Sequence, residues 1–290
     1  MKSKLILGTV QFGIKYGINN SAGKPTFRKV VDILNTAYVK GIRMLDTAEA
    51  YGDSQNRIGQ YHNQNSKKFK IITKFSPARK DLPKNIFDRV NKNLKTLRVE
   101  FLYCYMFHSF NDFKKYFPEM KNDLIRLKKE SKIKKIGVSL HSNKEIEDVL
   151  LNNYIDLIQL PYNLFDNNNQ RKEILKKSKL LGIEIHTRSV FLQGLFFKDS
   201  KNLSGNLKDL KNELDQLKTF VPKDKMNALA LNYAYSNKNI DGIIIGVDNS
   251  DQLLSNIECI EKNNFSKLIS KVDQINISNN LLLNPVNWKK

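Results

Sequence analysis

Short apolar runs alternate with longer amphipathic stretches along most of the chain. Within each run the apolar residues are nearly continuous, as expected of parallel strands that are covered on both faces, instead of alternating with polar residues. There are eight such runs, at residues 5–10, 42–48, 69–75, 101–108, 134–140, 156–162, 183–190 and 241–247. The pattern therefore predicts eight buried parallel strands.

The stretches between these runs have the apolar spacing of amphipathic helices. Thr26 and Ser142 stand where a side-chain oxygen would cap a helix start, and Asp81 is expected to start the helix at 84–97. Gly41 and Gly182 follow two predicted helix ends, where a left-handed residue is favoured. The predicted helices cover residues 26–40, 84–97, 112–131, 143–152, 168–181 and 249–261, with a weaker helix at 53–64.

Eight strands joined by helices predict a (β/α)8 barrel, the TIM-barrel fold, because each parallel connection needs a crossover. An open doubly wound sheet is the alternative, but its G-x-G-x-x-G motif does not follow the first run. Residues 191–240 depart from the alternation and predict a long loop and then helices at 207–219 and 223–236. Long loops at the catalytic rim of a barrel are usually functional. We find no linker or repeat and predict a single domain, residues 1–290.

Composition limits the classes of protein to consider. A hydrophobic content of 40% in 290 residues is enough for one large core. No apolar stretch approaches the roughly 20 residues of a membrane span, and MKSKLILGTVQFG resembles a first strand more than a signal peptide. Cys104 and Cys259 lack metal-ligand spacing and are typical of reduced cytosolic thiols. We therefore expect a cytoplasmic protein with no membrane partner.

The formal net charge is +20, from 49 Lys and Arg against 29 Asp and Glu. Such a charge can indicate nucleic-acid binding, and a basic barrel of that kind stays an alternative. The lysines are scattered over every predicted helix, however, which favours a solvated surface, so we expect no nucleic-acid partner. The positive field would still attract phosphorylated ligands such as a dinucleotide.

Four polar residues lie at or just after the ends of predicted strands: Asp46 and Tyr51 in LDTAEAYG, Lys74 in IITKF and His108 in YMFHS. Barrel enzymes carry their chemistry at this rim. A lysine ammonium lowers the pKa of a neighbouring tyrosine, and a carboxylate holds that lysine in place. An imidazole can donate a hydrogen bond to a carbonyl oxygen as negative charge develops on it. The four residues together predict proton donation to a carbonyl.

Lys74 could instead form a Schiff base, as lysines do in barrel aldolases, but Asp46 and Tyr51 beside it fit reduction better. The other three histidines have no matched partner in the sequence, and we interpret them as structural. No set of His, Asp or Glu has convincing metal-ligand spacing, so no metal ion is expected. The three structural histidines are His62, His141 and His186.

These motifs resemble the aldo-keto reductases. LDTAEAYG is similar to the Asp-Thr-Ala…Tyr-Gly signature of that family, ITKF to its lysine strand and YMFHS to its histidine strand. The likeness continues in order through GVSL, LIQLPYN and IIIGVDNSDQLLSN, over nearly the whole chain. The resemblance implies the eightfold barrel and a reduced nicotinamide dinucleotide, usually NADPH. It also implies that Tyr51 is the general acid, that Lys74 and Asp46 tune it, and that His108 orients the carbonyl.

The resemblance further implies a set of cofactor-binding residues. Departures from the family pattern are Leu140, where many members have asparagine, and a missing hairpin before the first strand. Where many NADPH-dependent members have a lysine and an arginine for the ribose phosphate, this chain has Gly246, Asp248 and Gln252. Losing those cations removes charge-assisted bonds, so we predict a weakened NADPH preference, with NADH as a second cofactor. The implied set is Ser139 and Gln159 at the carboxamide, Arg188, Ser189 and Phe191 by the ring and pyrophosphate, Gly8 and Thr9 behind the cofactor, and Gly246, Gln252 and Asn256 at the adenosine end.

The expected substrate is a small-molecule aldehyde or ketone. Phe12, Tyr16 and Tyr162 follow predicted strands and are expected to line its pocket, with ordinary loop packing as the alternative. GTVQFGIKYGINN and RSVFLQGLF resemble bacterial members associated with sugar or surface-polysaccharide metabolism, which suggests a sugar-like carbonyl. A dinucleotide-binding regulatory subunit with little turnover is the second hypothesis. The sequence predicts no oligomeric state.

Overall fold

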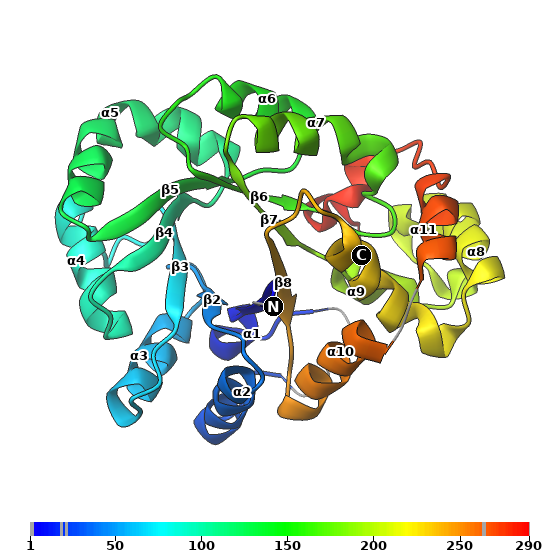
Figure 1. Cartoon of the computed structure of the whole chain (residues 1–290), viewed down its shortest axis with the longest axis horizontal. Helices are drawn as coiled ribbons and strands as arrows, with labels where there is room; N and C mark the ends of the chain where they lie inside the picture. The colour runs from blue at the N-terminus through cyan, green and yellow to red at the C-terminus, as the bar shows by residue number, and fades with distance from the viewer. Residues whose placement is uncertain (1–2, 18–19, 21–22, 263–264, 290) are drawn as a thin grey trace.

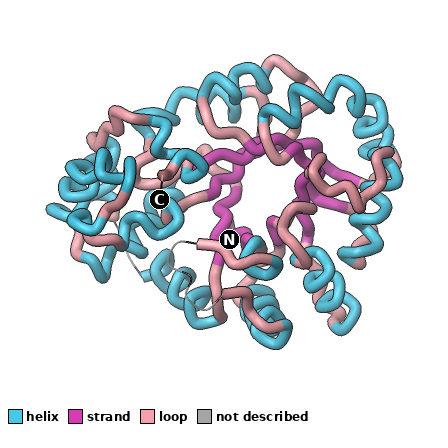
Figure 2. The backbone as a smooth tube through the Cα atoms, turned by 180° about the vertical axis from the view of Figure 1, so that it is seen from behind, coloured by secondary structure: helices cyan, strands magenta, loops and turns pink. Residues whose placement is uncertain are grey.

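The computed structural model describes residues 3–17, 20, 23–262 and 265–289. Its centre is a closed barrel in which eight parallel strands follow one another in chain order, and β8 pairs with β1 (Figures 1 and 2). All eight predicted strands and the (β/α)8 fold are confirmed. The strands are β1 Leu5–Gly8, β2 Met44–Asp46, β3 Lys70–Phe75, β4 Leu102–Phe107, β5 Ile133–Ser139, β6 Leu157–Pro161, β7 Glu184–Arg188 and β8 Gly242–Gly246.

Helices surround the barrel and cover the outer face of its strands (Figure 1). Every predicted helix is present, with ends shifted by a few residues, and the weaker one is a full helix. The short α1 was not predicted, because the first apolar run seemed to continue through Val10. The helices are α1 Val10–Gly13, α2 Phe27–Val39, α3 Ser54–Gln64, α4 Ile86–Leu97, α5 Phe110–Lys129, α6 Asn143–Leu150, α7 Asn168–Leu180, α8 Lys211–Phe220, α9 Met226–Ser236, α10 Ser250–Lys262 and α11 Ser266–Asp273.

Two of the three predicted side-chain caps are present. The Thr26 side chain accepts a hydrogen bond at the start of α2, and Ser142 forms a capping box with Glu145 at the start of α6. The prediction for Asp81 was wrong. Its carboxylate binds Arg79, and the α4 cap is Asn85, which lies next to the helix and accepts from its first amides.

Two apolar layers hold the barrel together. The larger one fills the space between strands and helices, and a smaller cluster of buried residues lies inside the barrel. The register of the strands determines which polar residues lie next to that inner cluster, toward the C-terminal ends of the strands. Asp46 pairs with Ile72 of β3, Lys74 comes two residues after Ile72 on the same face, and Ser139 pairs with Gln159. The inner cluster is formed by Ile6, Ile72, Cys104, Met106 and Leu157.

The opposite, N-terminal end of the barrel contains a polar cluster. Glu184 accepts hydrogen bonds from Tyr103 Oη at 2.8 Å and His186 Nε2 at 2.6 Å, and it forms an ion pair with Lys135. His186 is therefore buried inside the barrel. Only Ser3 and Lys4 precede β1 in the described residues, and they form no hairpin.

The predicted loop after β7 consists of three short 3-10 turns, at Leu192–Phe197, Ser200–Asn202 and Gly205–Leu210, followed by α8 and α9. The C-terminal segment after α11 packs against this loop, since Asn206 Nδ2 donates to Asn287 O at 2.9 Å. Trp288 packs on the core there, and its ring nitrogen donates to Leu282 O. None of the described helices has the length and apolar character needed to cross a membrane.

Candidate active site

The four residues singled out by the sequence meet at the C-terminal rim of the barrel. Lys74 Nζ donates to Asp46 Oδ1 at 2.5 Å and to Thr47 O at 3.0 Å. The same nitrogen lies 5.1 Å from the centroid of the Tyr51 ring. The Tyr51 and His108 rings are 5.7 Å apart and meet edge to face. The sequence predicted that these four residues lie at one rim, and the structure brings their side chains together there.

Burial divides these four residues into two levels. Asp46 and Lys74 are only 3% and 1% exposed, whereas Tyr51 and His108 are partly accessible above them. The phenol and the imidazole are therefore partly accessible from solvent, whereas the ion pair beneath them is not. This arrangement puts a fixed positive charge behind the tyrosine.

The pKa shift of Tyr51 has the opposite sign to the one that the sequence predicted. Burial raises the pKa of the Tyr51 phenol, and the smaller, opposite effect of Lys74 leaves that pKa above its ordinary value. The expected net lowering of the Tyr51 pKa was therefore wrong, because desolvation outweighs attraction to the ammonium. A raised pKa keeps the phenol protonated at neutral pH, as a proton donor requires.

Lys74 and His108 have opposite pKa shifts. Burial opposes the charge on Lys74, but Asp46 and then Tyr51 outweigh it, so the pKa of Lys74 lies above its ordinary value. Burial, followed by the charge on Lys74, lowers the pKa of His108 to about 4. Lys74 is therefore charged and His108 neutral near pH 7, so the imidazole has one N–H to donate.

A buried carboxylate that sequence reasoning missed fixes the loop containing Tyr51. Glu49 accepts from Arg89 Nη2 at 2.6 Å and from Asn93 Nδ2 and Tyr105 Oη at 2.8 Å each. These donors belong to α4 and β4, about 40 to 56 positions further along the chain. Glu49 is inside LDTAEAYG, but only the fold reveals its partners.

Two glycines allow the same loop to approach α1 closely. A Cβ on Gly13 would lie 1.7 Å from the Tyr51 carbonyl oxygen. Gly52, the residue after Tyr51, has φ +54°, and a Cβ there would lie 2.5 Å from the Gly13 oxygen. The Tyr-Gly pair of the motif is therefore needed for backbone geometry as well as for chemistry.

The residues expected near the nicotinamide lie at neighbouring strand ends. Ser139 and Gln159 are buried beside each other, and Gln159 Nε2 donates to Asp46 Oδ2 at 2.8 Å. Thr9 is fully buried, and its hydroxyl donates to the Asp46 backbone oxygen at 2.9 Å, fastening β1 to β2. A Cβ on Gly8 would lie 3.0 Å from the Ile244 side chain, so Gly8 serves strand packing.

The loop after β7 has an unusual backbone. Ser189, Leu192 and Gln193 have φ values of +61°, +43° and +52°, and Gly194 has +93°. Left-handed non-glycine residues cost of order 1–3 kcal/mol each and cluster at functional sites. Phe191 is half-buried within this loop, against Phe197. The loop is therefore held in one strained conformation at the rim.

At the end of β8, the Gln11 side chain occupies the space beside Gly246. A Cβ on Gly246 would lie 2.4 Å from Gln11 Nε2. Gln11 Oε1 is one of few buried side-chain oxygens, among the described residues, without a hydrogen-bond partner. Gln252 Oε1 accepts from the Asp248 amide at 2.8 Å, and Asn256 is buried, accepting from Asn227 of α9. An orphaned amide oxygen at this rim suits a ligand that brings an N–H donor.

The substrate-pocket prediction needs two corrections. Phe12 is 0% exposed because α1 turns it into the core. Tyr162 is 1% exposed because it stacks on Tyr233 of α9, with ring centroids 5.2 Å apart. Only Tyr16 is at the surface, 41% exposed, with its hydroxyl 3.5 Å from Gln193 Nε2. The alternative of ordinary packing holds for the other two.

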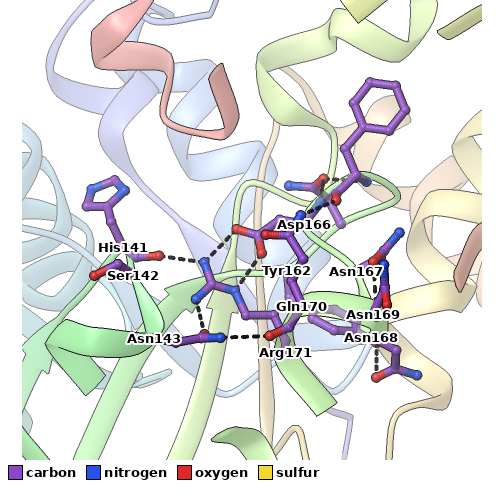
Figure 3. A network of polar contacts seen from close by, with 12 residues as sticks. His141, Ser142, Asn143, Tyr162, Asp166, Asn167, Asn168, Asn169, Gln170 and Arg171 are labelled. Atoms are coloured by element: carbon purple, nitrogen blue, oxygen red, sulfur yellow. Dashed lines mark hydrogen bonds and ion pairs between the residues drawn. The ribbon is translucent and has the colours of Figure 1, made fainter. Parts of the chain in front are cut away.

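A network of polar contacts holds the loops that follow β5 and β6 (Figure 3). Arg171 of α7 donates to Asp166 Oδ2 at 2.8 Å, to Asn143 Oδ1 at 2.6 Å and to the His141 backbone oxygen. Arg188, the last residue of β7, donates to Leu140 O at 3.2 Å and to His141 Nε2 at 2.9 Å. His141 is therefore at the site, which its isolated position in the sequence did not indicate.

A wide groove on the described structure lies away from these residues. A groove of about 1530 Å³ runs along α4 and the starts of β3 and β4, and its lining includes Lys70, Lys92, Lys95 and Arg98. It is an open surface feature at the N-terminal end of the barrel and includes none of the four rim residues. The candidate site is therefore defined by the chemistry of its side chains and not by this groove.

Known proteins match this chain in sequence and fold. The model of the Aldo/keto reductase family matches residues 4–277. A "Probable aldo-keto reductase 1" from Glycine max is 28% identical over 177 residues, which are 57% of this chain and 51% of that protein. The chain thus matches about half the length of this curated relative.

Two solved bacterial structures share the fold. Aldo-keto reductase AKR11C1 from Bacillus halodurans, in its holo form, superimposes with a TM-score of 0.75 at 20% identity, covering 96% of this chain and 94% of that one. Glycerol dehydrogenase AKR11B4 from Gluconobacter oxydans gives a TM-score of 0.71 at 21% identity, covering 94% and 91%.

Proposed function

The chain belongs to the aldo/keto reductase family of NAD(P)H-dependent enzymes, and from this premise we propose that it reduces an aldehyde or ketone to the alcohol, with Tyr51 as the acid. The observation that carries the proposal is a protonated, partly accessible phenol above a buried Lys74–Asp46 pair. We further propose a sugar-like carbonyl as the substrate, a single domain over residues 1–290 and a cytoplasmic location.

Each of the four residues has a distinct part in the proposed reaction. When bound, the reduced nicotinamide supplies the hydride that the carbonyl carbon accepts. Tyr51 gives its proton to the carbonyl oxygen, and the neutral His108 donates a hydrogen bond to that oxygen as its charge grows. The Lys74 ammonium stabilises the phenolate that remains, and Asp46 keeps Lys74 charged and in place.

The rim offers suitable groups for the cofactor. Ser139 and the amide oxygen of Gln159 would hold the nicotinamide carboxamide. Ser189 and Phe191 of the strained loop would contact the nicotinamide ring and the pyrophosphate. Gly8 and Thr9 would lie behind the cofactor. At the adenosine end, Gly246, Gln252 and Asp248 would face the ribose, while Asn256 would hold α10 against Asn227 of α9.

Transient oxidation of bound cofactor by a panel of carbonyls tests the proposed function. We expect the absorbance of the reduced nicotinamide to fall on mixing with sugar-like aldehydes or ketones, at rates of about 1–1000 per second, as is typical of enzymes. Cofactor binding without oxidation by any carbonyl would argue for the regulatory subunit. Fast oxidation of the cofactor by small aromatic aldehydes but not by sugar-like carbonyls would contradict the proposed sugar-like substrate. The proposed reductase function would still hold.

We predict that the preference for NADPH over NADH is weak, less than about tenfold in Kd, which is about 1.4 kcal/mol. Asp248 and Gln252 offer no cation to the ribose phosphate, and a carboxylate repels it. Fluorescence titration of both cofactors measures the ratio. Asp248→Arg should shift the ratio toward NADPH by at least about tenfold, because it adds a charge-assisted bond. A wild-type preference for NADPH above about 100-fold would contradict the prediction.

A further inference from the structure

Of the positively charged side chains described above at the rim, Arg188 is the one without a carboxylate partner. The two carboxylates whose charges act on this guanidinium each already have a cation. Asp46 binds Lys74, and Asp166 forms an ion pair with Arg171. In the described part of the chain, no carboxylate lies within ion-pair distance of Arg188.

The hydrogen-bond partners of Arg188 are all neutral. Its nitrogens donate to Leu140 O, to His141 Nε2 and, at 3.5 Å, to Ser189 Oγ. Burial lowers the pKa of His141 to about 3, and the charges of Arg188 and Arg171 act in the same direction, so this imidazole is an uncharged acceptor. Arg188 therefore has a fixed orientation but no counter-ion.

Arg188 is also near the reacting end of the site. Its charge acts on Tyr51, on Tyr16 and on His108, which surround the place where a carbonyl would bind. Removing a guanidinium from water without an anion to pair with it is costly, and such charges in proteins are normally paired. A half-buried, oriented and unpaired cation beside the proton donor suggests a ligand that completes the pair.

We propose that Arg188 is the binding partner of an anionic group, a carboxylate or phosphate, on the carbonyl substrate. The preferred substrates are then carbonyl compounds that carry such a group, including acidic or phosphorylated sugar-like compounds. The inference rests on the proposed reductase function and adds the chemical class of its substrate. It moves Arg188 from the cofactor residues, where the sequence resemblance put it, to the substrate side.

Paired substrates that differ only in the anion test this inference. The pairs are glyceraldehyde phosphate against glyceraldehyde, and para-carboxybenzaldehyde against its methyl ester. In the wild-type protein, kcat/KM for the anionic member of at least one pair should exceed that for the neutral member by about 10- to 100-fold, the usual effect of a charge-assisted hydrogen bond. Arg188→Met should reduce that ratio to near one, and Arg188→Lys should keep part of it.

Arg126→Met is the matched control. It removes the same charge from an exposed position on α5, so it reports any general effect of the positive field. Its selectivity ratio should equal that of the wild type. An equal loss of selectivity in Arg126→Met and Arg188→Met would overturn the proposal, since long-range attraction would then explain it.

A binding measurement separates substrate from cofactor. Benzoate and benzamide are titrated into the cofactor complex and followed by nicotinamide fluorescence, and cofactor Kd is measured for each variant. We expect benzoate to bind more tightly than benzamide in the wild type, and this difference to vanish in Arg188→Met. If Arg188→Met weakens cofactor binding while substrate selectivity is unchanged, the anion belongs to the cofactor and the proposal is wrong.

Failure of the inference differs from failure of the proposed function. If no carbonyl of either pair oxidises the cofactor, the reductase function fails, and the benzoate titration alone then decides whether Arg188 binds an anion. If both members of each pair react equally well in the wild type, the reductase function holds and the anionic substrate is excluded.

Discussion

Replacing Tyr51 with phenylalanine is expected to lower the rate of carbonyl reduction by about 10²- to 10⁴-fold, the usual contribution of a general acid. The change removes one oxygen from a partly accessible ring, and the ring itself keeps its edge-to-face contact with His108. Stability and cofactor Kd should therefore remain close to those of the wild type. Steady-state kinetics with the best carbonyl substrate, together with cofactor titration, measure both quantities.

Tyr154→Phe provides the control, because Tyr154 is a surface tyrosine, 41% exposed, in the turn before β6 and away from the rim. Its turnover should equal that of the wild type. If Tyr51→Phe turned over as fast as this control, another group would have to donate the proton. Loss of cofactor binding in Tyr51→Phe would show that the ring itself holds the dinucleotide.

Replacing Lys74 with methionine should lower the free energy of unfolding by about 3–5 kcal/mol, because it leaves the Asp46 carboxylate buried without its cation. It should also abolish reduction, since the phenolate formed at Tyr51 would lose its stabilising charge. Chemical denaturation followed by circular dichroism measures the first effect, and single-turnover kinetics measure the second.

A double variant separates stability from catalysis. Asp46→Asn in the Lys74→Met background removes the unpaired charge and leaves an amide that can still accept from Gln159. We expect most of the lost stability to return while activity does not. Return of activity together with stability would mean that the ion pair holds the fold and has no part in proton transfer. Equal instability of the single and double variants would contradict the buried-charge argument.

The sequence predicted the barrel and the meeting of Asp46, Tyr51, Lys74 and His108 for a simple physical reason. Near-continuous apolar runs separated by helices can bury both faces only as a parallel sheet, and parallel strands bring their ends to one rim. Local features such as the Ser142 cap were also predicted correctly, because the groups that they bind lie within one helical turn.

The local pattern failed where a side chain's partner is far along the chain. Phe12 and Tyr162 follow strands just as Tyr16 does, yet the first two are buried. The Glu49 contacts to α4 and β4 and the balance of charges around Arg188 likewise depend on residues that only the closed barrel makes neighbours.

By itself, the sequence determined the fold, the family and the four residues that meet at the rim. Only the tertiary structure decided the sign of the Tyr51 pKa shift and which charge near the site is left without a partner. Both depend on how much water folding removes from each group and on which opposite charges remain close. Desolvation and long-range pairing have no counterpart in the order of residues.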